Sequence, residues 1–69
     1  MKFIIKDFVD MHSVEIEPMR STGDSLVTIV QHAGSMHFQH TIRPDQARYM
    51  AAALQMAADE AENTGENHA

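Results

Sequence analysis

Hydrophobic and polar residues alternate over much of the first two thirds of the chain. Between His12 and Met19, valine and isoleucine alternate with two glutamates, which is the period of two typical of a half-buried strand. The β-branched run from Leu26 to His32 and the alternating run from Met36 to Ile42 predict two more strands. The segment from Lys2 to Val9 is rich in Phe and Ile and lacks Gly and Pro, so it predicts a further strand.

Two clusters of turn-forming residues separate the last three predicted strands. Ser21–Asp24 predicts a four-residue loop and Ala33–Ser35 a tight hairpin turn. Pairing across these turns places one set of residues on a single face, the apolar sheet face: Val14, Ile16, Val27, Ile29, Gln31, Met36, Phe38, His40 and Ile42. The opposite face collects polar side chains, so the pattern predicts an antiparallel meander. At Asp10 and Met11 it leaves open a tight turn or a bulge in one long strand.

The last third of the chain has the pattern of a helix. Pro44 suits a first helical position, and Asn63–Gly65 is typical of a helix stop. Apolar residues recur at spacings of three and four in between: Ala47, Met50, Ala51, Leu54, Ala57, Ala58 and Ala61. We therefore expect an α+β fold, an antiparallel three- to four-stranded meander sheet packed by one C-terminal helix. Residues 1–63 form its single domain, and residues 64–69 form a flexible tail.

The helix is expected to cover the apolar sheet face, with Phe38 in the core, so that Phe38→Ala should unfold or severely destabilise the protein. Its apolar surface exceeds what one sheet face needs, because Tyr49, Ala53 and Met56 lie beside the stripe. This surplus indicates a second contact, or only the helix propensity of alanine. A chain of 69 residues without cysteine buries a small core, which favours a homodimer.

Composition narrows the chemistry. The absence of cysteine excludes disulfides, thiolate metal sites and a cysteine nucleophile. No apolar run is long enough for a membrane span and the first residues do not form a signal peptide, so we expect a cytoplasmic protein without membrane contact. The serines lie in turns and the carboxylates on exposed strand positions, so we expect neither an enzyme nor a cofactor.

Five histidines raise the question of a metal site. His32 and His37 are predicted cross-strand neighbours on the polar face, where Glu15 or Glu17 could add a ligand. His40 has the parity of the apolar face. Histidines on a solvated sheet face are commoner than ligands, so no metal is predicted.

Charge is unevenly distributed along the chain. The net charge is −5 and the basic residues are scattered, which argues against direct binding of nucleic acid. Asp59, Glu60 and Glu62 gather in the last helical turns, where the helix dipole disfavours carboxylates. Such a cluster suits a basic protein surface, although it also serves solubility. The predicted partner-binding residues are Tyr49, Met56, Asp59, Glu60 and Glu62.

The short acidic meander followed by Arg43-Pro44-Asp45-Gln46-Ala47-Arg48, which opens an Ala-rich helix, resembles small host-takeover inhibitors encoded by bacteriophages. Among these it is similar to the quorum-sensing anti-activator of Pseudomonas phages. The resemblance implies a dimeric inhibitor of a host transcriptional regulator of the LuxR type, a DNA-binding protein, and a second action on a pilus-assembly ATPase. The alternative is an anti-CRISPR inhibitor that acts as an acidic nucleic-acid mimic.

Overall fold

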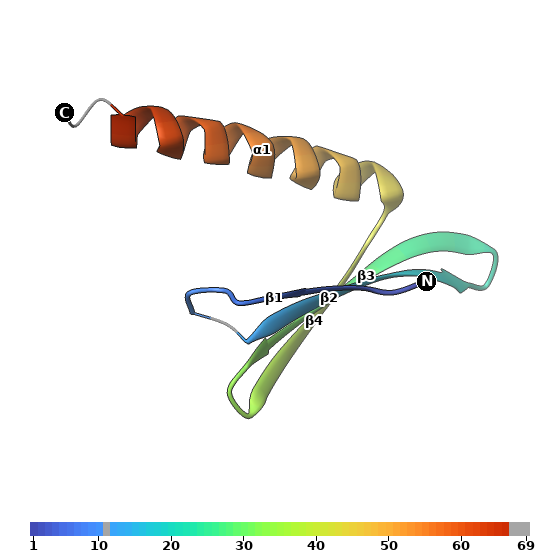
Figure 1. Ribbon diagram of the computed structural model, residues 1–69. Coiled ribbons are helices and arrows are strands. Elements are labelled where there is room, and N and C mark those ends of the chain that lie inside the picture. The colour runs from blue at the N-terminus through green and yellow to red at the C-terminus, as the bar shows by residue number, and fades with distance from the viewer. Residues whose placement is uncertain (11, 67–69) are drawn as a thin grey trace.

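The computed structural model describes residues 1–10 and 12–66, which form four strands and one helix (Figure 1). The strands are β1 (Phe3–Lys6), β2 (Ser13–Ser21), β3 (Asp24–Ala33) and β4 (Met36–Ile42), and the helix is α1 (Pro44–Glu66). The sheet is antiparallel throughout, with the strands in chain order β1-β2-β3-β4. This is the predicted α+β meander, and its fourth strand is present.

Two tight turns set the register of the last three strands. Ser21 lies opposite Asp24, so the β2–β3 loop is two residues rather than the predicted four, with Thr22 at φ 48° and Gly23 at φ 85°. Positive φ at both positions is the signature of a type I′ turn. Gly34, at φ 63°, opens the β3–β4 turn. The shorter first loop leaves the predicted register unchanged, because removing one residue from each end of a loop preserves the pairing.

The first strand is shorter than predicted. It covers Phe3–Lys6 instead of Lys2 to Val9 and pairs with β2, placing Ile5 opposite Val14. Asp7 follows at φ 67°, a left-handed conformation that ends the extended chain. The predicted join includes Met11, which lies outside the described residues, so the choice between turn and bulge stays a prediction.

Local hydrogen bonds fix the start of α1. The side chain of Gln46 accepts a hydrogen bond from the Arg43 backbone N–H at 3.0 Å, and the Ala47 N–H donates to the Arg43 carbonyl at 3.0 Å. This is the glutamine half of a capping box, and Pro44 needs no N–H partner at the first position. At the other end, the helix continues to Glu66 through the predicted stop at Asn63–Gly65, so residues 64–66 of the predicted tail are helical. Residues 67–69 lie outside the described part.

The register confirms the predicted apolar and polar sheet faces, but the helix covers little of the apolar one. Among the side chains that the structure describes, only Val14 and Thr28 are buried. The helix meets the sheet mainly at β3, around a hollow lined by apolar residues of both layers: Ile16, Val27, Ile29, Ala47, Met50, Ala51 and Leu54. Phe38 is 48% exposed, so the expectation of a buried core Phe38 is wrong for the single chain.

The β2–β3 turn holds a strained residue that can be improved. Thr22 is β-branched, and such side chains are disfavoured at positive φ, whereas asparagine tolerates it and Asn-Gly is the preferred type I′ pair. We expect Thr22→Asn to raise the free energy of unfolding by about 1 kcal/mol. Urea denaturation measures it. Thr22→Val, which retains the branching, should give no such gain, and equal stability of the two variants would contradict the argument.

Candidate protein-binding surface

Tyr49 and Met56 lie on the side of α1 that faces away from the apolar hollow. Ala47, Met50 and Leu54 line that hollow, and the helical repeat of 3.6 residues turns Tyr49 and Met56 away from it. The two side chains are seven residues apart and so share one stripe, and they are 79% and 71% exposed. The structure therefore presents both predicted apolar binding residues to solvent.

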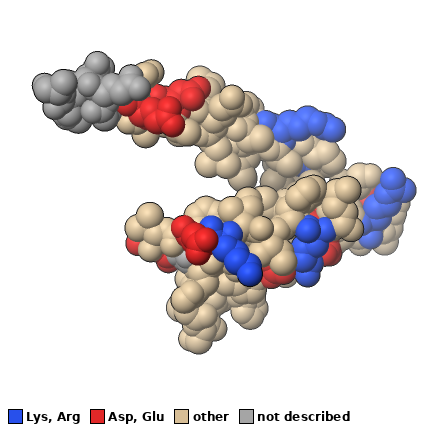
Figure 2. Space-filling view, viewed as in Figure 1, with Lys and Arg blue, Asp and Glu red and all other residues tan. Residues whose placement is uncertain are grey.

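The three predicted acidic residues are also exposed and adjoin Met56. Asp59 and Glu60 follow Met56 by three and four residues, so they are its neighbours on the helix surface. Glu62 lies about 120° around the helix from Met56, at the edge of the side that faces the sheet. No basic residue occupies the last turn. Figure 2 shows carboxylates gathered over the C-terminal part of the helix. We call Tyr49, Met56, Asp59 and Glu60 the outer helix face, and Glu62 lies at the border between this face and the side toward the sheet.

A second, separate apolar recess, shallow and open, borders this face at the start of the helix. Its lining includes Ile42 from the end of β4 and Tyr49, Met50 and Ala53 from the helix, around about 590 Å³. Arg43 donates to the carboxylate of Asp45 at the rim, from Nε at 3.1 Å, and this hydrogen bond lowers the pKa of Asp45. The outer helix face thus joins an apolar recess at one end to a negative cluster at the other.

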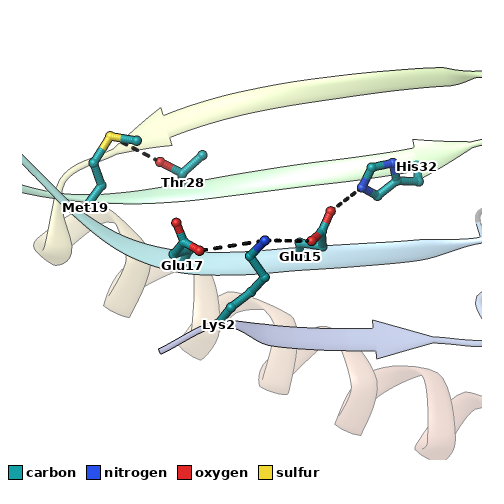
Figure 3. A network of polar contacts seen from close by, with 6 residues as sticks. All are labelled: Lys2, Glu15, Glu17, Met19, Thr28 and His32. Atoms are coloured by element: carbon teal, nitrogen blue, oxygen red, sulfur yellow. Dashed lines mark hydrogen bonds and ion pairs between the residues drawn. The ribbon is translucent and has the colours of Figure 1, made fainter.

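A polar network occupies the sheet face opposite the helix (Figure 3). Lys2 Nζ lies 3.2 Å from Glu15 Oε1 and 3.8 Å from Glu17 Oε2, and His32 Nε2 pairs with the second oxygen of Glu15. Thr28, buried beside them, donates from its hydroxyl to the sulfur of Met19 at 3.6 Å. Glu15 is the centre of the network, since both of its carboxylate oxygens have partners.

The contacts of Glu15 shift two titrations. The hydrogen bond with His32, followed by the one with Lys2, holds the pKa of Glu15 below its ordinary value. The hydrogen bond with Glu15 raises the pKa of Lys2, and the charges of Glu15 and Glu17 add to the effect. These groups stay in contact with water, so each shift is screened and the network fixes side-chain positions more than it stabilises the fold.

The cross-strand pair His32 and His37 forms as predicted, with ring centroids 6.2 Å apart. Over the part of the chain that the structure describes, no three His, Asp or Glu side chains converge as they would to hold a metal ion. His40 lies opposite Ile29 in the register, on the apolar side of the sheet. Of these three histidines, His32 has a charged partner, because its Nε2 pairs with the carboxylate of Glu15.

Sequence reasoning did not find the Lys2–Glu15–His32 network. The sequence pattern places Glu15 and His32 on the same face, but it does not determine which strand the first one pairs with. Once Ile4 is opposite Glu15, Lys2 comes within reach of both glutamates. The alternating sequence of the first strand, Lys-Phe-Ile-Ile-Lys, carried this signal only weakly, because two consecutive isoleucines obscure its two faces.

Comparison with protein-family models, with curated proteins and with solved structures finds no match for this chain. Within residues 1–10 and 12–66, no helix combines the length and the apolar character that crossing a membrane requires. The arrangement itself defines a small α+β fold with an exposed amphipathic helix.

The network predicts an acid-sensitive contribution to stability. A carboxyl whose pKa is lowered on folding stabilises the native state above its unfolded pKa, and this is lost as the pH falls through the folded value. Glu15→Gln should melt at a lower temperature than the native chain at neutral pH. The two melting temperatures should converge as the pH falls below the ordinary pKa of a glutamate side chain.

The matched control is Glu17→Gln, which removes the carboxylate that lies farther from Lys2 and leaves the His32 contact in place. Its melting temperature should stay closer to that of the native chain across the same pH range. A pH profile of Glu15→Gln parallel to the native one would contradict the assignment of the acid sensitivity to Glu15.

Proposed function

We propose that this chain is a non-enzymatic protein-binding inhibitor that acts in the cytoplasm of a host cell and binds a DNA-binding transcriptional regulator through the outer helix face. The carrying observation is the exposed acidic cluster beside Met56, at a helix end without basic residues. The resemblance to phage anti-activators suggests a regulator of the LuxR type as the target. A second action, on a pilus-assembly ATPase, rests on the resemblance alone.

The chemistry of the outer helix face supports a basic partner. Exposed Tyr49 and Met56 supply apolar and aromatic contact area, which is enriched in interface hot spots. The neighbouring carboxylates complement the lysines and arginines that a DNA-binding domain presents to phosphates. Binding there would occlude the DNA-contacting surface, so inhibition needs no chemical step.

The acidic cluster also disfavours the nucleic-acid-mimic alternative. A mimic needs negative charges spaced along an extended surface, as phosphates are. Here three acids lie within four consecutive helical positions, while Glu15 and Glu17 on the sheet are close to Lys2. Localised charge of this kind fits one basic patch on a folded domain better than a groove that binds a nucleic-acid strand.

The proposal is tested by replacing Asp59, Glu60 and Glu62 together with Gln. The variant should fold as well as the native chain or slightly better, because carboxylates leave the negative end of the helix dipole. Its association rate with the purified DNA-binding domain of a LuxR-type regulator should fall about tenfold at low salt, with a weaker salt dependence, because steering is lost. Surface plasmon resonance at two salt concentrations measures both.

The control replaces Asp7, Asp10 and Asp24 with Asn, which removes the same number of charges from exposed sites between β1 and β2 and at the start of β3. It should retain the native association rate. Equal loss in both triple variants would show that net charge matters and position does not. Failure of the native chain to displace operator DNA from the regulator, or association with a CRISPR ribonucleoprotein instead, would overturn the proposal.

A further inference from the structure

The single chain exposes more surface than a folded monomer of its mass. Its accessible surface is 5841 Å² and its mass 7.7 kDa, for which folded monomers average about 4,300 Å². The radius of gyration is 14.8 Å, against about 11 Å for a compact domain of this length. The excess of about 1,500 Å² calls for a structural explanation.

The helix contributes to this excess because little of it is covered. With 23 residues it is about 34 Å long, yet it meets the sheet only near its start. From Pro44 to Asn63, only Pro44 and Ala47 are even partly buried. Leu54 is 64% exposed although it points toward the sheet, and Ala58 and Ala61 continue its stripe, which Glu62 borders near the C-terminal end. We call this stripe the inner helix face.

The sheet also has apolar side chains that the helix leaves uncovered. Phe3, Ile5 and Phe38 lie on the apolar sheet face by register, and they are 54%, 47% and 48% exposed. Figure 2 shows open space between the C-terminal half of the helix and the sheet. An apolar wedge therefore opens between the inner helix face on one side and the two outer strands on the other.

We propose that the wedge is occupied by the helix of a second copy of this chain, in a two-fold symmetric dimer. Each copy has an exposed apolar helix stripe and an uncovered apolar sheet face. In a two-fold symmetric contact, the helix stripe of each copy covers the sheet face of the other. Covering the excess of two chains would bury about 3,000 Å², within the range of about 2,000–5,000 Å² found for obligate homodimers.

A second copy fits this wedge better than an unrelated partner for a further reason. The protomer buries only two of its described side chains, too small a core for a stable domain. A surface that completes the core must be present whenever the chain is folded, and only another copy of the chain meets that condition. Folding and association are then one equilibrium.

Sedimentation equilibrium of the native chain at micromolar concentration should give twice the chain mass of 7.7 kDa. Its melting temperature should rise with protein concentration, because mass action favours the dimer. A single-copy mass together with a melting temperature independent of concentration would overturn the proposal whatever the variants do.

Two variants locate the contact. Leu54→Glu places a charge on the inner helix face and Met56→Glu places the same charge on the outer helix face, at positions that are 64% and 71% exposed in the protomer. Leu54→Glu should lose the dimer, sedimenting as a monomer or unfolding. Met56→Glu should remain a dimer with native helix content by circular dichroism.

Unfolding of Leu54→Glu also supports the proposal, since a residue so exposed in the protomer would tolerate glutamate if the protomer were the stable unit. Three outcomes overturn it: both variants stay dimeric, both dissociate, or only Met56→Glu dissociates. The first would place the contact away from the helix, and the other two would place the outer helix face in it.

Discussion

The pairing register of β2 with β3 is the constraint on which the rest of this structure depends. Thr22 and Gly23 fix it by adopting positive φ, and the second turn at Gly34 continues the same two faces into β4. A slip of one residue would turn Val14 and Ile16 of β2 to the opposite face from Ile29 of β3, and it would bring Glu15 onto the face beneath the helix. One small turn thus decides which face is apolar and where the polar network can form.

With that register, the two sheet faces differ in how fully their side chains are paired or covered. On the polar face, Glu15 has a partner for each oxygen and Thr28 is buried with its hydroxyl paired. On the apolar face, the helix leans over β3 and leaves aromatic and aliphatic side chains exposed. The central polar groups of the polar face find their partners within one chain, whereas the apolar face leaves large apolar side chains exposed to water. The polar face therefore holds the strands in place, and the apolar face is available for a further contact.

The sequence predicted the meander, both sheet faces and the start of the helix, because these follow from local periodicity and turn chemistry. The predicted bounds of β4, Met36–Ile42, and the predicted first residue of the helix, Pro44, agree with the structure to the residue. The first strand was overextended, since Phe and Ile favour strands while the left-handed Asp7 that ends it leaves no sequence signal of its own. The prediction that Phe38 is buried was wrong. Periodicity gives the face on which a side chain lies, whereas the tilt of the helix decides whether the helix covers that part of the face.

The candidate binding residues show the same division. Their exposure on the helix could be predicted, because a helical repeat places Tyr49 and Met56 opposite the inner stripe. The partner could not be predicted, because electrostatic complementarity defines a class of surface and not a particular protein. The direction in which the outer helix face points has a further consequence. The proposed pairing through the wedge would leave that face free on both copies, so the dimer would be bivalent. A target with two-fold symmetry could then be held by both faces at once, and the second contact would form at high effective concentration even where each single contact is weak.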